Sequence, residues 1–379
     1  MHHHTRVCIN LRAYAKNLQK VASLLSPACR LCVVLKADAY GHGLDLLAPA
    51  AYAAGVDAIA IADNAEAEIV RKLGIPCTLI RLRPSFPEEV EESLQWGVEE
   101  IAGSLDQAIY LSELGEKKRS PIPVHLALDV GIGRMGFSYS SQKDQIERVC
   151  RLPGLRIAGV MTHFPCADEE KLSISKEQWI RFNQDVESIK PMLPKDVVVH
   201  IANSAAILRM PESHHHMVRL GIVSYGLSPS PAVSMAPDIQ PVMSVATKIT
   251  QIRDVAKGST IGYGMTYRLD RDSRIAVLPI GYANGYLRAF SNKSDVLIRQ
   301  TRCPVVGRIS MNMTTVDIGR LSEVQPGDEA VLLGVQGTQY ISADELARCA
   351  GTINYEITCI LGNLNREYRI AIDDEVYDI

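Results

Sequence analysis

Residues 32–43 have the sequence Cys-Val-Val-Leu-Lys-Ala-Asp-Ala-Tyr-Gly-His-Gly, in which four apolar residues lead directly into Lys36. The apolar run predicts a buried strand, and the polar segment after it, which contains Tyr40, predicts a turn. A lysine at the end of a buried strand needs a reason, because an ammonium group resists leaving water. A desolvated lysine can form a Schiff base with a carbonyl compound, whereas a lysine that snorkels to solvent has no such role. The local sequence leaves both interpretations open.

The same alternation of apolar strand and amphipathic helix continues through the first two-thirds of the chain. Eight runs are expected to be strands: 31–35, 58–62, 77–82, 100–102, 124–128, 157–162, 197–201 and 218–224. Helix-period segments lie between them at 44–54, 65–73, 87–95, 105–114, 142–150 and 176–190, and another, 11–25, precedes the first strand. Such alternation predicts a parallel α/β fold, and a closed (β/α)8 TIM-like barrel suits the length. A doubly wound sheet is the alternative, although no G-x-G-x-x-G segment follows the first strand.

After about residue 237 the pattern changes to strand-like runs separated by turn residues. These runs are 242–252, 275–280, 296–299, 314–318, 330–333 and 368–372, and residues 343–350 form the clear helical segment. We therefore expect two domains, a barrel at 1–237 and a mainly β domain at 238–379, with a proline-rich linker at 228–238. His2 to His4 are interpreted as a tag remnant and are left out of the fold prediction.

The composition is that of an ordinary water-soluble enzyme, with 379 residues, 47% hydrophobic and 22% charged, and a net charge of −3. This balance gives no electrostatic case for binding nucleic acid or an anionic membrane. No apolar run approaches the ~18 residues of a membrane helix, and the start lacks a secretory apolar region. The nine cysteines have no framework spacing, which favours a reducing cytoplasm.

Two short clusters raise the question of a redox or metal site. Cys29 and Cys32 form a C-x-x-C pair, but no second pair completes a zinc site, so two small apolar residues entering a strand are favoured. His214 to His216 follow Pro211 on a polar segment and are expected in a solvated loop rather than on a metal. No metal site is predicted.

Polar residues follow the ends of the predicted strands, where α/β barrels gather their active sites. They are Lys36 and Tyr40 after the first strand, Asp129 to Arg134 after the fifth, Thr162 and His163 after the sixth, Asn203 and Ser204 after the seventh, and Arg219, Gly221 and Ile222 at the eighth. The loops after the last two strands often bind phosphate, and Gly221 has no Cβ to keep a phosphate away from its backbone. A Schiff-base lysine and a phosphate site in one barrel mouth indicate pyridoxal phosphate (PLP).

Each of these residues also has an ordinary structural role open to it. His163 can be a satisfied histidine at a strand end, and Arg219 can pair with a helix carboxylate. Asn203 and Ser204 can cap the next helix. Their shared position at one end of a barrel favours the functional interpretation.

Nine segments, in order, resemble the alanine racemases, PLP-dependent enzymes with a barrel and a C-terminal β domain. They are VVLKADAYGHG (33–43), DVGIGRMG (129–136), GVMTHF (159–164), HIANSAA (200–206), VRLGIVSYGLSP (218–229), IGYGMTY (261–267), PIGYANGY (279–286), GRISMN (307–312) and NYEI (354–357). The resemblance therefore covers nearly the whole chain, and it implies the same barrel and β-domain fold.

The resemblance implies a role for each matching residue. Lys36 would hold PLP covalently and act as one acid/base, and Tyr263 from the other subunit of a head-to-tail homodimer would be the second. The remaining roles are phosphate binding by Tyr40, Ser204, Gly221, Ile222 and Tyr355, contacts to the PLP ring by His163, Asn203 and Arg219, and substrate or entrance contacts by Arg134, Met311 and Tyr282. The implied activity interconverts L- and D-alanine and supplies D-alanine for peptidoglycan.

This assignment agrees with the chemistry of the residues. Two bases on opposite faces of the α-carbon racemise most simply, and lysine and tyrosine have similar unperturbed pKa values. A carboxylate at the ring nitrogen would keep that nitrogen protonated, whereas Arg219 cannot accept its proton. PLP is then a weaker electron sink, so the carbanion is shorter-lived and transamination is suppressed. Arg219 therefore also disfavours a PLP decarboxylase of the same architecture. A non-catalytic PLP carrier is disfavoured by the long β domain with its tyrosines.

Four places depart from the usual pattern of the family: Ala127, Asn312, Asn284 and the C-terminal run ILGNLNREY (360–368) near its arginine. Ala127 stands where many members carry a carbamylated lysine that orients the arginine, so Arg134 must be held by a bound anion or another side chain. Asn312 and Asn284 stand where aspartate is usual. These changes affect the expected substrate range more than the expected chemistry, and the alternative is a racemase of broader specificity that includes serine.

Overall fold

The computed structural model describes residues 4–236, 238–319, 321–366 and 369–372. The chain divides into two compact units. The barrel unit consists of Ala15–Ala37 and Leu47–Ile239, and the β unit consists of Met1–Tyr14, Asp38–Leu46 and Gln240–Ile379. The expected boundary at residue 237 lies outside the described residues, as do His2 and His3, and the division at that point stays a prediction.

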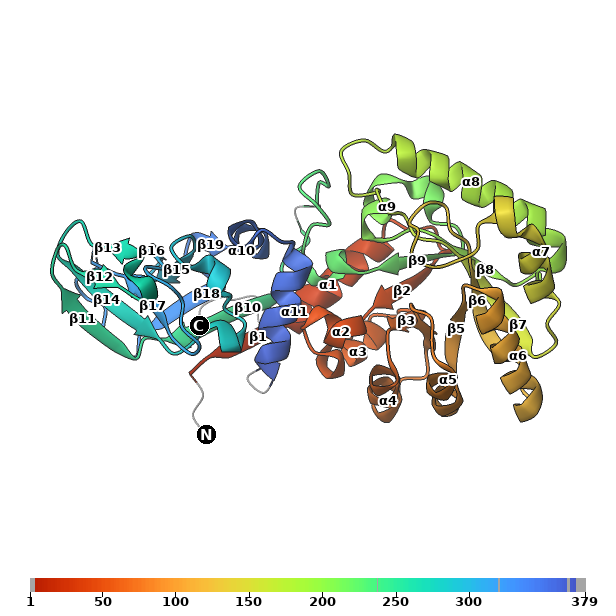
Figure 1. Cartoon of the computed structure of the whole chain (residues 1–379), viewed down its shortest axis with the longest axis horizontal. Coiled ribbons are helices and arrows are strands. Elements are labelled where there is room, and N and C mark those ends of the chain that lie inside the picture. Colours follow the sequence, from red (N-terminus) through yellow and green to blue (C-terminus); the bar gives the residue numbers. More distant parts are fainter. Residues whose placement is uncertain (1–3, 237, 320, 367–368, 373–379) are drawn as a thin grey trace. The chain divides into compact units, whose positions relative to one another are not determined.

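Eight parallel strands form the centre of the barrel unit (Figure 1). They are β2 (Arg30–Val34), β3 (Ala58–Ile61), β4 (Thr78–Arg81), β5 (Val98–Ala102), β6 (Ile122–Ala127), β7 (Leu155–Met161), β8 (Val198–His200) and β9 (Met217–Leu220). Each strand pairs with its neighbour in the chain up to β8, and β2 also pairs with β9. The His216 N–H donates to the Val199 carbonyl at 3.1 Å and the Arg219 N–H to the Ala202 carbonyl at 2.9 Å, so the two ends of the sheet meet. The predicted TIM-like barrel is confirmed.

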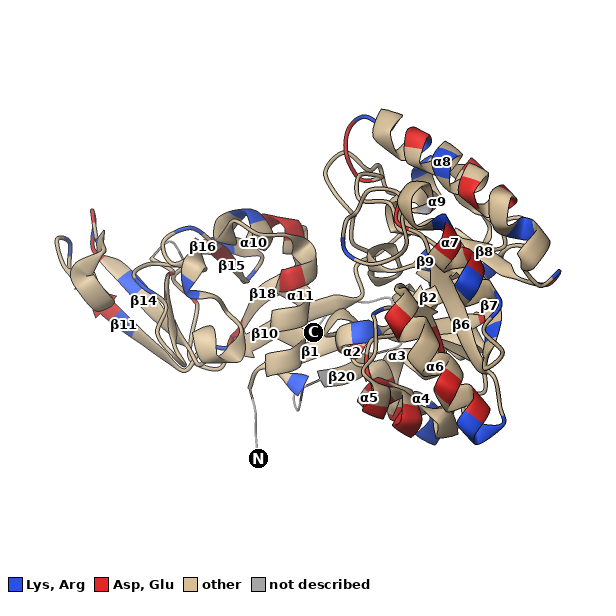
Figure 2. Cartoon of the chain, turned by 45° about the vertical axis from the view of Figure 1, so that its right-hand side comes forward, with Lys and Arg blue, Asp and Glu red and all other residues tan. Residues whose placement is uncertain are grey.

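Helices lie on the outside of this barrel (Figure 1). They are α4 (Asn64–Lys72), α5 (Pro87–Ser93), α6 (Leu105–Lys118), α7 (Tyr139–Cys150), α8 (Ser173–Ile189) and α9 (Ser204–Arg209). Helices α1 (Leu11–Ala22), α2 (Lys36–Tyr40) and α3 (Leu44–Ala53) contain the points where the chain passes from one unit to the other. Both acidic and basic residues lie along α6 and α8 (Figure 2). No described helix combines the length and the apolar character that crossing a membrane requires.

Local sequence explains most of these elements. The barrel strands are short runs rich in Val, Ile and Leu, because both faces of a parallel sheet inside helices are buried. Helix α4 starts where the Asp63 side chain accepts the Glu66 N–H, and α6 starts where Ser104 accepts the Gln107 N–H. The last strand was expected to reach residue 224, but it ends at Leu220. Gly221 leaves the extended conformation there, and a 3-10 helix, η4 (Ile222–Tyr225), follows.

The β unit is built mainly from the C-terminal part of the chain. Its strands are β1 (Arg6–Asn10), β10 (Met243–Lys248), β11 (Gln251–Val255), β12 (Thr260–Ile261), β13 (Tyr267–Arg268), β14 (Ser273–Leu278), β15 (Asp295–Ile298), β16 (Thr301–Pro304), β17 (Thr314–Asp317), β18 (Glu329–Gln336), β19 (Gln339–Ile341) and β20 (Arg369–Ile372). A seven-stranded sheet runs in the order β16-β15-β18-β10-β1-β20, with β19 paired to β18. Strands β11, β14 and β17 form a second sheet, and β12 and β13 form a hairpin. The expected mainly β domain is therefore present.

Three features of the β unit differ from the expectations. Strand β1 was not predicted, and it joins the C-terminal sheet between β10 and β20. The single run expected at 242–252 is two strands, β10 and β11. Helix α11 (Asn354–Leu364), which follows α10 (Ala343–Ala350), was also missed. A five-residue strand at the start of a chain takes its identity from partners that are more than 200 residues away, which local periodicity does not reveal.

A fully buried ion pair joins neighbouring barrel strands, and its removal is expected to destabilise the fold. Arg81 Nε lies 3.0 Å from Glu100 Oε2, and both side chains are inaccessible to solvent. Replacing Glu100 with alanine leaves a buried guanidinium unpaired, so we expect the free energy of unfolding to fall by about 3–5 kcal/mol. Urea unfolding followed by circular dichroism measures this loss. Glu91→Ala, which breaks an exposed pair with Lys118 on the same side of the barrel, should leave the urea midpoint unchanged. Equal midpoints for the two variants would contradict the prediction.

Candidate active site

The predicted site residues of the barrel unit lie at the carboxyl ends of its strands. Lys36 follows β2, Arg134 lies in the loop after β6, His163 follows β7, Asn203 and Ser204 follow β8, and Gly221 and Ile222 follow β9, which itself carries Arg219. Because all eight strands are parallel, these ends share one side of the barrel (Figure 1). The strand-end residues selected from the sequence are therefore neighbours in space.

Arg219 is buried, and protein acceptors hold most of its guanidinium. Nη1 donates to His200 Nδ1 at 2.6 Å and to the His200 carbonyl at 3.2 Å. Nη2 donates to the carbonyls of Thr162 at 2.7 Å and Ile201 at 3.2 Å, and it lies 3.3 Å from His163 Nδ1. No carboxylate in the described part of the chain bonds to this guanidinium, so its observed partners are not those of a helix ion pair. Among the described residues none accepts the Nε–H, which fits a further acceptor such as the ring nitrogen of a pyridine.

His163 lies in a strongly positive environment. Burial, followed by the charges of Arg219, Arg134 and Lys36, lowers its pKa to about 3. Its imidazole is therefore neutral near pH 7. A neutral, buried aromatic ring suits packing against a flat, apolar ligand better than it suits acid catalysis.

Asn203 and Ser204 have different functions at the start of α9. The Asn203 side chain accepts the Ala206 N–H at 3.1 Å and donates to the Phe164 carbonyl at 3.2 Å, so Asn203 is the helix cap. Ser204 was also open to the capping role, but its Oγ instead accepts the Gly221 N–H at 2.9 Å. The Ser204 hydroxyl proton and the Ile222 N–H have no acceptor among the described residues. Two free donors beside a glycine fit the oxygens of a phosphate group.

Lys36 opens an unusual turn. Its side chain is half-buried, and the next four residues, 37–40, all have φ of 54–55°, so α2 is left-handed. Each such non-glycine residue costs roughly 1–2 kcal/mol. The His42 Nδ1 lies 3.0 Å from the Ala39 carbonyl, and Asp38 accepts the Leu44 N–H at 2.8 Å. Strain of this kind directly after a lysine is typical of functional sites. The sequence pattern indicated a turn, but it did not indicate Asp38 and His42 as its supports.

Arg134 is carried by a loop that Asp129 organises. The Asp129 carboxylate accepts the backbone N–H groups of residues 131–133 at 2.9–3.2 Å. The Arg134 side chain is exposed and has no acidic partner among the described residues. Ala127, where the family usually has lysine, packs in an apolar cluster with Ile101, Met161 and Met135. These apolar neighbours do not suit an anion beside Ala127, so the loop organised by Asp129 is the visible support of Arg134.

Tyr263 lies in the β unit at the start of a 3-10 helix, η5 (Tyr263–Met265). Gly262 and Gly264 on either side have φ of 74° and 73°, which favours glycine, and a Cβ on Gly262 would lie 2.8 Å from the Arg308 nitrogen. The two glycines therefore present Tyr263 outward, and its side chain is 69% exposed.

Tyr282 and Met311, the expected entrance and carboxylate contacts, belong to two loops that are joined by hydrogen bonds. The Tyr282 N–H donates to the Ser310 carbonyl at 3.1 Å, and the Ala283 N–H donates to the Met311 carbonyl at 2.9 Å. The two asparagines that depart from the family pattern meet between these loops, because Asn312 Nδ2 donates to Asn284 Oδ1 at 3.4 Å. Two aspartates there would repel each other, so this contact depends on the amides.

Tyr40 and Tyr355, two predicted phosphate ligands, also lie together in the β unit. Their ring centroids are 5.9 Å apart. Burial raises the pKa of Tyr40 above its ordinary value, so its phenol keeps its proton. A protonated phenol can donate a hydrogen bond to an anionic oxygen.

The cysteine and histidine clusters have structural roles. Burial raises the pKa of Cys29 to about 11 and that of Cys32 to about 12, so both thiols stay protonated and unreactive. His214 is buried rather than solvated, and its Nε2 lies 3.0 Å from the Ile207 carbonyl. His216 Nδ1 accepts the Val199 N–H at 3.0 Å. No metal-binding group of three His, Cys, Asp or Glu residues occurs in the described part of the chain.

Two family models match this chain, one over its barrel part and one over its C-terminal β part. Residues 9–229 match the model of the alanine racemase N-terminal domain, and residues 242–368 match that of the alanine racemase C-terminal domain. An alanine racemase of Syntrophobacter fumaroxidans is 37% identical over 359 residues, which cover 95% of this chain and 96% of that protein. A broad specificity amino-acid racemase of Pseudomonas taetrolens is 36% identical over 360 residues, covering 94% and 87%. The crystal structure of alanine racemase from Bartonella henselae with covalently bound pyridoxal phosphate has a TM-score of 0.88 and 27% identity, covering 97% of this chain and 99% of that chain.

Proposed function

The chain belongs to the alanine racemase family, and we propose that it interconverts L- and D-alanine with PLP as cofactor. The observation that carries the proposal is the set of groups at the barrel mouth. Lys36 follows a buried strand, Arg219 keeps a donor free for a ring nitrogen, and Ser204 and Ile222 keep donors free for a phosphate. Each of the three groups on a PLP molecule has a matching residue.

PLP, when bound, draws electron density from the α-carbon of an attached amino acid and so makes its α-proton acidic. Lys36 Nζ would take or deliver that proton on one face of the α-carbon. The partner subunit's Tyr263 would do the same on the other face through its Oη. Because the two groups have similar ordinary pKa values, neither direction of racemisation is strongly favoured.

Arg219 would select racemisation over other reactions of the same cofactor. A guanidinium can only donate hydrogen bonds, so it does not protonate the ring nitrogen as a carboxylic acid would. The α-carbon would then regain its proton quickly, which disfavours both transamination and decarboxylation. His163, neutral and buried, would pack near the ring, with Asn203 close by.

The substrate carboxylate would be held by Arg134 and the Met311 backbone, with Tyr282 at the entrance. The backbone loop of Asp129 supports Arg134, and an apolar cluster replaces the usual carbamylated lysine. This looser anchoring, together with the contact between Asn284 and Asn312, favours a second candidate function, a racemase whose range includes serine. The similarity to the Pseudomonas taetrolens enzyme supports the same alternative.

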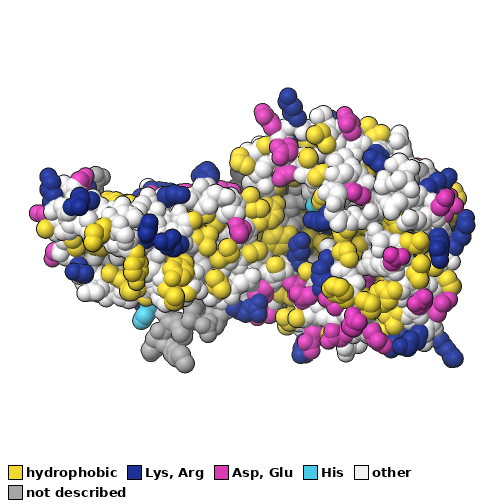
Figure 3. Space-filling model, in the orientation of Figure 1, with side chains coloured by type: hydrophobic (Ala, Val, Ile, Leu, Met, Phe, Trp, Pro, Cys, Tyr) yellow, Lys and Arg dark blue, Asp and Glu magenta, His cyan; other side chains and the backbone are white. Residues whose placement is uncertain are grey.

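A head-to-tail homodimer is supported by exposed apolar residues around Tyr263. Tyr263, Met265, Met311 and Met313 are 69%, 72%, 56% and 54% exposed, and all belong to the β unit. Figure 3 shows hydrophobic side chains on the visible face of the molecule. Large apolar side chains that gather on a surface mark a contact with another molecule. A second copy of the chain would cover them and would place Tyr263 at a barrel mouth, where Tyr40 and Tyr355 would complete the phosphate site.

The proposed biological setting is the cytoplasm, where the product D-alanine would supply peptidoglycan synthesis. Nine free cysteines, several of them buried with raised pKa values, support a reducing compartment.

The proposed activity is tested by incubating the PLP-loaded protein with single enantiomers of alanine, serine and lysine in deuterated water. We expect α-deuterium and the opposite enantiomer to appear together, fastest with alanine, as measured by mass spectrometry and chiral chromatography. Similar rates for alanine and serine would establish the broader racemase. Absence of α-exchange with every amino acid would exclude racemase activity, and carbon dioxide release without exchange would indicate a decarboxylase.

A further inference from the structure

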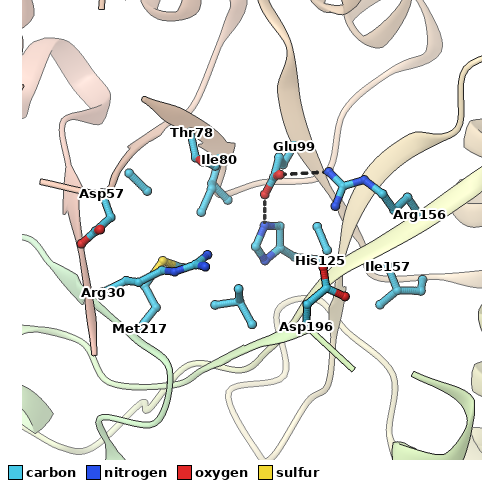
Figure 4. Close-up of a pocket in the computed structure, with 13 residues that line it drawn as sticks. Arg30, Asp57, Thr78, Ile80, Glu99, His125, Arg156, Ile157, Asp196 and Met217 are labelled. Atoms are coloured by element: carbon cyan, nitrogen blue, oxygen red, sulfur yellow. Dashed lines mark hydrogen bonds and ion pairs between the residues drawn. The ribbon is translucent and has the colours of Figure 1, made fainter. Parts of the chain in front are cut away.

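A cavity of about 370 Å³ lies at the opposite end of the barrel from the candidate active site. Its polar lining comes from the amino-terminal ends of the strands and the residues just before them: Arg30, Asp57, Thr78, Glu99, Arg156 and Asp196. Figure 4 shows these side chains around His125, with Glu99 bonded to both His125 and Arg156. The barrel floor is therefore polar and accessible to solvent.

A chain of hydrogen bonds runs from this floor to Arg219. His125 Nε2 lies 2.8 Å from Glu99 Oε2, and His125 Nδ1 lies 2.8 Å from His200 Nε2. His200 Nδ1 lies 2.6 Å from Arg219 Nη1. Both histidines are fully buried, and the four residues come from four different strands, β5, β6, β8 and β9. The interior of the barrel thus links a carboxylate at the floor to the arginine at the mouth.

The direction of every bond in this chain follows from one fact, that arginine has no acceptor. Because Arg219 must donate, His200 Nδ1 must accept, and the proton of a neutral His200 sits on Nε2. That proton is donated to His125 Nδ1, so the proton of His125 also sits on Nε2 and is donated to Glu99. The Glu99 carboxylate is the final acceptor.

The charges along the chain agree with this direction. Burial and the charge of Arg219 lower the pKa of His200 far below its ordinary value, so it is neutral. Burial alone would raise the pKa of Glu99, but the bonds from His125 and Arg156 outweigh it and lower the pKa. The chain therefore has a guanidinium at one end, a carboxylate at the other and the neutral imidazole of His200 next to the guanidinium.

We propose that Glu99 and His125 are positioning residues for Arg219. By accepting the His125 proton, Glu99 stabilises from the other end of the chain the same tautomers of both histidines that Arg219 requires, in which His200 presents a bare Nδ1 to Arg219 Nη1. This acceptor holds the guanidinium so that its free Nε–H serves the cofactor ring nitrogen. The inference rests on the proposed function for its catalytic consequence, whereas the bonded chain itself is a property of the barrel alone.

The test combines NMR and kinetics on Glu99→Ala, Glu99→Gln and Asp196→Asn. In the wild type, 15N-labelled histidine should show His125 and His200 as neutral Nε2–H tautomers, with assignments from single His→Gln variants. In Glu99→Ala the His125 signal should become a mixture of tautomers, whereas Glu99→Gln, whose amide oxygen can accept the same proton, should keep the wild-type pattern. Asp196→Asn removes a carboxylate from the same floor without touching the chain, and it serves as the matched control.

Two further measurements report on Arg219. The resonance of PLP labelled with 15N at its ring nitrogen should shift in Glu99→Ala but not in Asp196→Asn. The kcat for alanine should fall about tenfold with KM nearly unchanged, as expected when one hydrogen bond of a buried network is lost. Glu99→Gln should recover most of the wild-type ring-nitrogen resonance and most of the wild-type kcat. A general loss of structure in Glu99→Ala would not predict this recovery.

Three results would overturn the inference: Nδ1–H tautomers in the wild type, unchanged histidine signals in Glu99→Ala, or an unchanged PLP ring-nitrogen resonance in that variant. If Glu99→Ala does not fold, Glu99→Leu replaces it, and the same signals decide. Failure of the proposed function gives a different result, namely a wild type that exchanges no α-proton. The histidine tautomers can be measured in such a protein as well, so they test the inference independently of activity.

Discussion

Lys36→Ala is expected to abolish racemisation, with a loss of kcat of about 10⁴-fold or more. The substitution removes both the covalent attachment point of PLP and one of the two proton-transferring groups, and a positioned acid/base alone contributes about 10²–10⁴-fold. In the wild type, borohydride reduction followed by peptide mass spectrometry should place the PLP mass on the peptide that contains Lys36. In the Lys36→Ala variant, the same peptide should carry no PLP mass.

The control for this prediction is Lys20→Ala, which removes a surface lysine that pairs with Asp238 at 2.9 Å. It should keep both the modified peptide and the wild-type rate. Added methylamine should restore part of the rate of Lys36→Ala, because a free amine can replace the missing base. Wild-type turnover by Lys36→Ala, or PLP attached to another lysine, would contradict the assignment.

Tyr263→Phe should lower racemisation by about 10²–10⁴-fold while leaving PLP attachment intact. The variant lacks only the phenolic proton, so Lys36 should still exchange the α-proton on its own face. In deuterated water one enantiomer of alanine should therefore gain deuterium without inversion, and the other should react very slowly. Tyr267→Phe, a neighbouring tyrosine that packs against Ile261 and Leu269, is the matched control and should behave as the wild type.

The same variant tests whether the two bases come from different chains. In a mixture of Lys36→Ala and Tyr263→Phe subunits, a hybrid dimer with shared sites has one site in which both residues are intact. After statistical reassortment about a quarter of the wild-type activity should return. If Tyr263 serves the barrel of its own chain, no hybrid site is complete and the mixture stays inactive.

Most of the barrel was predictable because its signals are local. A short run such as Ala58–Ile61 needs only its own apolar residues to indicate a buried strand, and eight of them in alternation with helices leave few topologies. Strand β1 was not predictable in this way, since its partners β10 and β20 lie at the other end of the chain. Helix α11 was missed because the residue at its N-cap is Ile353, whose side chain cannot accept a hydrogen bond and so gives no helix-start signal.

In the candidate site too, some features could be predicted from the sequence and others could not. Lys36, His163, Asn203 and Gly221 could be selected because they follow strand ends, which is a matter of position in the chain. The separate functions of Asn203 and Ser204 could not be predicted, since either side chain can cap a helix. The left-handed turn after Lys36 was also beyond prediction, because Ala, Asp and Tyr do not ordinarily adopt that conformation and neighbouring groups must hold it.

By itself, the sequence determined the barrel followed by a β domain, the family, and the residue types at the strand ends, because these depend on periodicity and on order along the chain. Only the tertiary structure decided what each side chain bonds to. The hydrogen-bonded chain from Glu99 through His125 and His200 to Arg219 joins residues up to 120 positions apart, and only Arg219 of the four was selected as a site residue from the sequence. Hydrogen bonds need atoms within about 3 Å, and that distance is set by how the strands close into a barrel.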